Sequence, residues 1–150
     1  MTVTILDGGM GRERSGAPFR QPEWSALALI ESPEHVGRAH AAFARNGAEV
    51  ITTNSYAVVP FHIGQERFDA EGLKLADLAG KLARQTADEF GIKVAGSLPP
   101  VLGSYRPDLF NAEAARPILE VLIEGLSPYA DIWLAETQSS LAEVSLVREL

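Results

Sequence analysis

Two acidic residues and a glycine-rich turn are the features of this sequence with the clearest chemical potential. The apolar segment Val3–Leu6 ends in Asp7, and Gly8 and Gly9 follow at once. Glycine allows the backbone to turn with positive φ and lets a ligand approach the peptide N–H groups closely. A carboxylate beside such N–H groups can hold both ends of a zwitterion, which makes this turn a candidate amino-acid site. A tight turn closed by an Asx hydrogen bond is the structural alternative.

A second carboxylate, Glu136, follows the apolar segment Ile132–Ala135. Two carboxylates that converge on one mouth suit a cationic group such as an ammonium, and they could also share a proton as an acid/base pair. The structural alternative for Glu136 is a favourable charge at the start of the next helix. The second negative charge argues against a phosphate ligand, and the turn after Asp7 lacks the full Gly-x-Gly-x-x-Gly pattern of dinucleotide sites.

Shorter polar side chains follow two further apolar segments. Asn54 comes after the segment over 49–53, and Ser97 comes after the segment over 92–96. Both are candidate pocket residues, with loop capping as the structural alternative. Three histidines complete the titratable candidates. We expect His35 and His40 to be solvated on a helix away from the strand ends. We expect His62 to lie on the surface or behind the site.

Alternating strands and helices would bring these side chains together. Four β-branched apolar segments predict buried strands, at 3–6, 49–53, 92–96 and 131–135. Four segments with helical periodicity and capping residues predict helices, at 32–46, 69–90, 111–126 and from 139 onward. Strand ends that recur at intervals of roughly 40–45 residues predict a parallel α/β fold with right-handed crossovers. Ligands of such folds bind at the carboxyl ends of the strands, where all the candidate residues lie.

Bulk properties restrict the class of protein. The chain has 150 residues and a formal net charge of -7, which argues against a nucleic-acid partner. It contains no apolar run long enough to cross a bilayer and no basic leader, so we expect no membrane association and a single cytoplasmic domain over residues 1–150. It has no cysteine, and its histidines do not form a His-x-x-x-His pair, so we expect no metal site within the chain.

Four stretches together resemble the N-terminal half of the homocysteine S-methyltransferase family. This family includes the homocysteine-binding domains of methionine synthase and betaine–homocysteine methyltransferase. The stretches occur in the order of the family, at its strand ends, and the resemblance spans essentially the whole chain. They are DGGMG (7–11), NGAEVITTNSY (46–56), AGSLPP with GSYRPD (95–108) and DIWLAET (131–137).

The resemblance implies a TIM barrel, of which this chain would be the first four βα units: a half barrel truncated on its C-terminal side. The full-length family transfers a methyl group from an activated donor, such as S-methylmethionine, to the thiol of homocysteine and forms methionine. It uses zinc held by three cysteines, because zinc coordination produces the nucleophilic thiolate at neutral pH.

The match also assigns roles to residues of this sequence. Asp7 and Glu136 would hold the ammonium of homocysteine, and the N–H groups of the two glycines after Asp7 would hold its carboxylate. Asn54 and Ser97 would be further pocket residues. One departure from the family lies at Arg12, where a small threonine is usual, and this change would alter the rim of the pocket.

The larger departure is the absence of cysteine, which removes the zinc site and leaves no catalytic residue in the chain. We therefore expect neither bound zinc nor methyl transfer by these residues alone. Two other classes of function stay open. A half barrel with open strand edges could be a non-catalytic module that binds an amino acid and pairs with a second copy or a complementary C-terminal half. A different α/β enzyme could use Asp7 and Glu136 as an acid/base pair without a metal.

Overall fold

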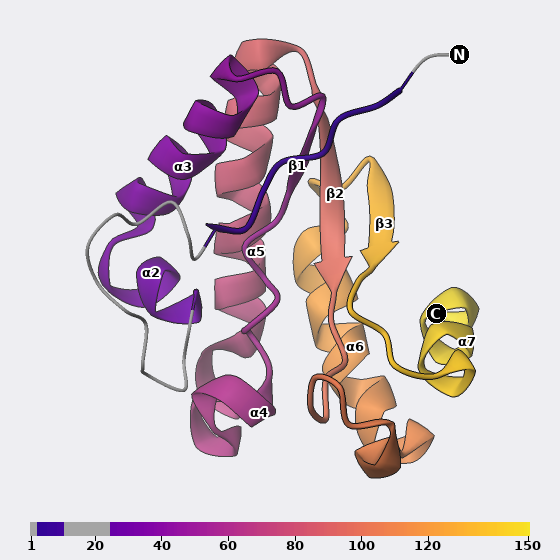
Figure 1. Ribbon diagram of the computed structural model, residues 1–150. Coiled ribbons are helices and arrows are strands. Elements are labelled where there is room, and N and C mark those ends of the chain that lie inside the picture. The colour runs from indigo at the N-terminus through magenta and orange to yellow at the C-terminus, as the bar shows by residue number, and fades with distance from the viewer. Residues whose placement is uncertain (1–2, 11–24) are drawn as a thin grey trace.

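A short parallel sheet with its strands in chain order lies at the centre of the protein (Figure 1). The computed structural model describes residues 3–10 and 25–150. The strands are β1 (Val50–Thr52), β2 (Lys93–Leu98) and β3 (Ile132–Ala135), and β2 pairs in parallel with both others. Three of the four predicted strands and their parallel pairing are thus confirmed.

The segment over 3–6 runs parallel to β1 but is not a regular strand. Leu6 forms an isolated bridge with Val50, and the N–H of Glu49 donates to the carbonyl of Ile5 at 2.8 Å. The prediction of a full strand here was wrong. In the described structure this segment and Asp7 make two backbone hydrogen bonds with Glu49 and Val50, which are too few for a regular ladder.

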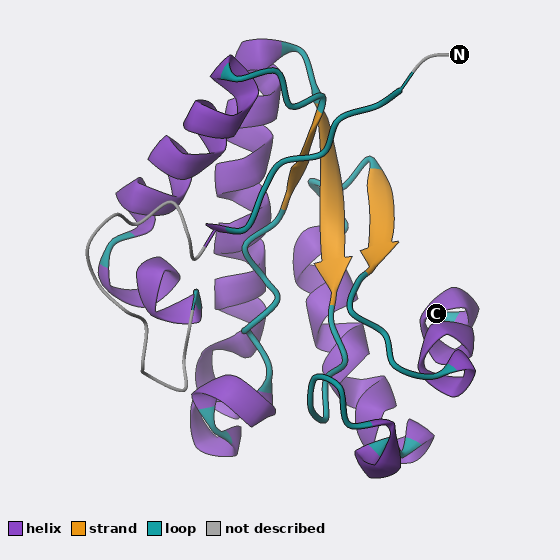
Figure 2. Cartoon of the chain, in the orientation of Figure 1, coloured by secondary structure: helices purple, strands orange, loops and turns teal. Residues whose placement is uncertain are grey.

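The three longest helices pack on one face of the sheet, and the last helix lies beyond the edge of β3 (Figures 1 and 2). A single face for the connecting helices is what right-handed crossovers between strands in chain order produce. The helices are α2 (Ala26–Glu31), α3 (Pro33–Arg45), α4 (Pro60–Ile63), α5 (Gln65–Phe90), the 3-10 helix η1 (Pro107–Leu109), α6 (Ala112–Leu126) and α7 (Leu141–Glu149).

Capping residues mark the start or the end of several helices close to the positions that the sequence predicts. The side chain of Asn111 accepts a hydrogen bond from the N–H of Ala114 at 3.0 Å, and Ser140 forms a capping box with Glu143. Gly91 ends α5 in the left-handed conformation, with φ of 68°. Helix α5 begins at residue 65 rather than 69, so the prediction placed its start too late.

The long loop predicted between the glycine turn and Ser32 is described only in part. Residues 11–24, with Arg12, lie outside the described residues, so the prediction about the pocket rim stays a prediction. The end of that loop forms α2, which the sequence analysis did not predict. No helix in the described ranges is long and apolar enough to cross a membrane.

The middle and the edges of the sheet differ in burial. Every residue of β2 after Lys93 is buried, because strands flank it on both sides and helices cover it. The outer elements carry exposed apolar side chains: Ile5 is 55% exposed on one side and Trp133 is 44% exposed on the other. Exposed apolar side chains on unpaired strand edges are typical of surfaces that another polypeptide covers.

Small residues allow α5 and α6 to pack closely. Ala76, Ala79 and Ala83 of α5 are fully buried. A Cβ atom added at Gly125 of α6 would lie 2.6 Å from the Cβ of Ala76 and 3.0 Å from the backbone N of Asp77. The absence of a side chain at this position therefore sets how closely the two helices approach.

We predict that Gly125→Ala lowers the free energy of unfolding by about 1–2 kcal/mol, because the added methyl group overlaps the backbone and side chain of α5. Gly37 of α3 provides the matched control, since a Cβ added there meets nothing within 4 Å. Gly37→Ala should leave stability unchanged or raise it by up to about 1 kcal/mol through helix propensity. Urea unfolding followed by circular dichroism measures both, and equal effects of the two substitutions would contradict the packing argument.

Candidate functional site

Asp7 is held in place by the end of β1. Its backbone N–H donates to the carbonyl of Val50 at 3.0 Å. Its carboxylate accepts two hydrogen bonds from Thr52, one from the backbone N–H to Oδ2 at 2.9 Å and one from the hydroxyl to Oδ1 at 2.7 Å. The side chain of Asp7 is only 4% exposed. A neighbouring strand therefore orients this carboxylate at the carboxyl end of the sheet.

Burial raises the pKa of Asp7 above its ordinary value, because removal from water disfavours the charged form. The two hydrogen bonds from Thr52 lower the pKa of Asp7, and the negative charge of Glu136 raises it further. This charge effect requires the two carboxylates to lie in the same region of the site. A cation bound beside Asp7 would stabilise its charged form.

Glu136 is joined to Ser97 across the two neighbouring strands. The hydroxyl of Ser97 donates to Oε1 of Glu136, and the N–H of Glu136 donates to the carbonyl of Leu98 at 3.3 Å. Ser97 is fully buried. The structure thus brings two predicted site residues into direct contact, and Ser97 orients Glu136 much as Thr52 orients Asp7.

A buried group of hydroxyls links β1 to β2 directly behind this pair. The N–H of Ser97 donates to Oγ1 of Thr53 at 2.9 Å, and the hydroxyls of Thr53 and Ser55 lie 2.9 Å apart. The hydroxyl of Ser55 donates to the carbonyl of Ser97 at 3.1 Å. The sequence analysis did not single out Thr52, Thr53 and Ser55 as site residues, although the run of short polar residues after β1 carried the signal.

Asn54 points toward the start of α2. Its Nδ2 donates to the carbonyl of Ser25 at 3.0 Å, and no hydrogen bond within the described ranges joins it to Asp7 or Glu136. This contact corresponds to the structural alternative of loop fixing. A direct role of Asn54 in ligand binding stays a prediction.

The two glycines after Asp7 differ in their surroundings. Neither has a positive φ, so the conformational reason given for them was wrong. A Cβ at Gly8 would lie 2.8 Å from the Phe43 ring of α3, whereas a Cβ at Gly9 would meet no atom of the described residues within 4 Å. Gly8 therefore allows close packing against α3, and the open space at Gly9 suits the approach of a ligand to the backbone.

His40 lies beside Asp7, and its predicted exposure to solvent was wrong. It is 0% exposed, and its Nδ1 lies 4.0 Å from Oδ2 of Asp7. Burial lowers the pKa of His40 to about 4, so the imidazole is neutral at physiological pH. The signal was present in the sequence, because His40 follows Val36 by one helical turn and precedes Phe43 on the same apolar face.

The other two histidines have contacts of different kinds. His35 is partly exposed beside Glu34, with 3.1 Å between its Nδ1 and the carboxylate, as expected for a surface residue. The ring of His62 contacts the rings of Tyr56 and Phe61, with centroids 6.1 Å and 5.0 Å away. His62 is thus part of an aromatic group near the loop after β1.

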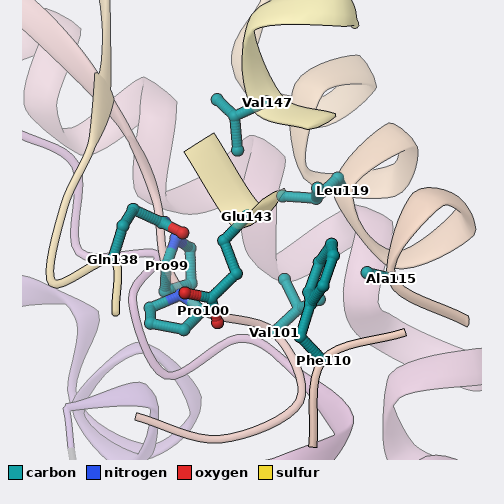
Figure 3. Close-up of a pocket in the computed structure, with 9 residues that line it drawn as sticks. All are labelled: Pro99, Pro100, Val101, Phe110, Ala115, Leu119, Gln138, Glu143 and Val147. Carbon is teal, nitrogen blue, oxygen red and sulfur yellow. The ribbon is translucent and has the colours of Figure 1, made fainter. Parts of the chain in front are cut away.

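A small pocket lies between the loop after β2 and helix α7 (Figure 3). Its volume of about 10 Å³ accommodates roughly one water molecule. Pro99, Phe110 and Val147 supply apolar walls, and the carboxylate of Glu143 accepts hydrogen bonds from the N–H groups of Ser139 and Ser140 at 2.7 and 2.9 Å. Because that carboxylate caps α7 and the pocket is too small, this is not the amino-acid site.

A sequence model described as homocysteine S-methyltransferase matches residues 4–150. The chain belongs to the homocysteine S-methyltransferase family. Among curated relatives, homocysteine S-methyltransferase 1 of Brassica oleracea var. italica is 35% identical over 94 residues, which cover 61% of this chain and 29% of that protein. Homocysteine S-methyltransferase YbgG of Bacillus subtilis is 32% identical over 174 aligned positions, which cover 99% of this chain and 54% of that protein.

The fold also matches solved structures of this homocysteine S-methyltransferase family. The metallated form of the homocysteine methyltransferase MmuM from Escherichia coli superposes with a TM-score of 0.84 at 28% identity, over 99% of this chain and 58% of that one. The apo form of the same enzyme gives a TM-score of 0.71. The chain therefore spans about half the length, or less, of the homocysteine methyltransferases that it matches.

The metal chemistry of the homocysteine S-methyltransferase family does not fit the side chains of this chain. The sequence contains no cysteine. No group of three or more His, Asp or Glu side chains in the described residues could hold a metal ion. The described site consists instead of two carboxylates, their hydroxyl partners and one neutral imidazole.

We predict that His40 makes the stability of the protein fall with acid. An unfolded histidine takes up a proton below about pH 6.5, while the folded residue does so only near pH 4, so stability falls as the pH falls across this range. The expected loss is roughly 3 kcal/mol. Urea unfolding from pH 7 to pH 4 measures it, and His40→Leu should remove most of this dependence. The control His35→Leu should keep the pH dependence of the wild type, and an unchanged profile in the His40→Leu variant would contradict the assignment.

Proposed function

We propose that this chain is the amino-acid-binding half of a homocysteine S-methyltransferase. Residues 1–150 would form one domain with the first four βα units of a (β/α)8 barrel. The complete enzyme would transfer a methyl group from an activated donor, such as S-methylmethionine, to the thiol of homocysteine and form methionine. The observation that carries this proposal is the pair of carboxylates at the carboxyl ends of the sheet, the buried Asp7 and the partly buried Glu136.

The two carboxylates would hold the ammonium of homocysteine between them. Each already has one partner that orients it, Thr52 for Asp7 and Ser97 for Glu136, and each has acceptor capacity left for an N⁺–H donor. In this partly buried position the like charges repel each other, and a single cation relieves that repulsion. Ammonium binding would therefore be favoured over binding of a neutral or anionic group.

The N–H groups of Gly8 and Gly9 would hold the carboxylate of the amino acid. Support comes from the space at Gly9, where a Cβ would meet no atom of the described residues within 4 Å. In this arrangement Ser97 acts by holding Glu136, and Asn54 acts by fixing the loop after β1.

The group that activates the sulfur of homocysteine would come from outside residues 1–150. A free thiol has a pKa of about 8.5, so it needs a group that stabilises the thiolate at neutral pH. In the full-length family, zinc would supply that stabilisation, and the zinc ligands that the family resemblance implies are cysteines, which this sequence lacks. We therefore propose that the 150-residue chain binds homocysteine but does not methylate it.

We predict that Asp7→Asn and Glu136→Gln each weaken the binding of L-homocysteine by about tenfold or more, because each removes a charge-assisted hydrogen bond to the ammonium. Isothermal titration calorimetry on the purified chain measures the dissociation constants. Asp88→Asn is the matched control, since Asp88 forms a surface ion pair with Arg84 on α5. It should bind homocysteine like the wild type.

A second ligand separates ammonium recognition from general thiol binding. The analogue 4-mercaptobutanoate lacks the ammonium, so it should bind the wild type weakly and lose little further affinity in the Asp7→Asn variant. Equal affinity of the wild type for both ligands, or absence of homocysteine binding, would overturn the proposal. Zinc-dependent methionine formation by the chain alone would overturn its second part.

The exposed edges of the sheet would be covered by the complementary C-terminal half of the barrel or by a second copy of the chain. Coverage of only 54% and 58% of two full-length relatives supports this proposal. We predict that the isolated chain is larger than a monomer in size-exclusion chromatography with light scattering. Ile132→Glu on β3 should shift it toward the monomer, whereas the control Leu109→Glu on η1 should not. A monomeric wild type would contradict self-pairing.

A further inference from the structure

His40 is a fully buried side chain near the site, and the proposed binding mode does not use it. Among the described residues it is the one histidine with both ring nitrogens buried and without a hydrogen-bond partner. Buried polar groups in folded proteins are almost always paired, so an unpaired imidazole needs a reason. Its position next to Asp7 supplies one.

A small shift of the His40 side chain would bring it within hydrogen-bond distance of Asp7. The distance from Nδ1 to Oδ2 is 4.0 Å, and hydrogen bonds of this kind close at about 2.7–3.2 Å, so a shift of roughly 1 Å is enough. Oδ2 already accepts the N–H of Thr52, and a carboxylate oxygen has two acceptor positions. The same face of α3 contacts the site a second time, because Phe43 packs against Gly8. Helix α3 is therefore set directly against the Asp7 turn.

We propose that His40 is a positioning residue for Asp7: with its proton on Nδ1, the neutral imidazole donates to Oδ2 when an ammonium binds. This inference rests on the proposed function, because it concerns the same amino-acid site. The added donor keeps the carboxylate ionised and fixes its direction toward the ligand. The groups that face this carboxylate in the described structure are Thr52 from β1, Glu136 from the end of β3 and His40 from α3.

The neutrality of the imidazole is part of the argument. A protonated histidine at this distance would pair with Asp7 and compete with the ammonium of the ligand. Burial keeps the pKa of His40 near 4, so at physiological pH the residue offers a hydrogen bond without a competing charge. A neutral donor also offsets the effect of burial and of Glu136, both of which favour protonation of Asp7.

Three substitutions at one position separate the donor from the bulk of the ring. The amide of asparagine can place a donor where Nδ1 lies, the amide of glutamine places it nearer Nε2, and leucine has none. Calorimetry with L-homocysteine should show about tenfold weaker binding for His40→Leu and His40→Gln, and His40→Asn should stay within about threefold of the wild type. The acid limit of homocysteine binding should move up by about one pH unit in the two weak variants.

The analogue 4-mercaptobutanoate provides the readout that a merely structural role would not give. Its affinity, measured by NMR titration, should be unchanged by all three substitutions, because it has no ammonium to meet Asp7. Equal weakening of both ligands, or equal homocysteine binding by the asparagine and glutamine variants, would overturn the role of His40. If His40→Leu fails to fold, the comparison of asparagine with glutamine decides. Absence of homocysteine binding by the wild type would instead overturn the proposed function itself.

Discussion

The double hydrogen bond from Thr52 to Asp7 is the interaction on which the arrangement of the site depends. Backbone hydrogen bonds from Asp7 to Val50 and from Glu49 to Ile5 pair the segment before Asp7 with the β1 region, and the two bonds from Thr52 fix the carboxylate at its end. The bonds from Thr52 also offset part of the cost of burying a carboxylate, since each donor stabilises the charged form. They therefore hold the Asp7 side chain, which the glycine turn follows, in a defined position relative to the sheet.

The second half of the site is built in the same way from a different pair of strands. Ser97 orients Glu136, and the hydroxyls of Thr53 and Ser55 hold Ser97 against the end of β1. Parallel pairing makes this possible, because it places the carboxyl ends of all strands along one edge of the sheet. Burial and the charge of Glu136 both raise the pKa of Asp7, and such perturbed groups often lie at functional sites.

The helical layer holds the strand ends in this position. Helix α5 spans the middle of the molecule, and its small residues allow both the sheet and α6 to approach it closely. Helix α3 packs on the other side of α5 and brings Phe43 and His40 against the Asp7 turn. The layer covers one face of the sheet, and apolar residues stay exposed at the outer edges of the sheet.

The sequence by itself determined the family, three of the four predicted strands and the position of Asp7, Ser97 and Glu136 near the carboxyl ends of the parallel segments. These follow from local properties: apolar periodicity, capping residues and short motifs next to strands. Only the tertiary structure decided that residues 3–6 pair too weakly for a regular strand, that Gly8 is needed for contact with Phe43, and that His40 is buried beside Asp7. Each of these depends on what lies across from a residue rather than on its neighbours along the chain. A local pattern shows which face of a helix is apolar. Which polar side chain of that face reaches the site depends on how the helix packs on the sheet.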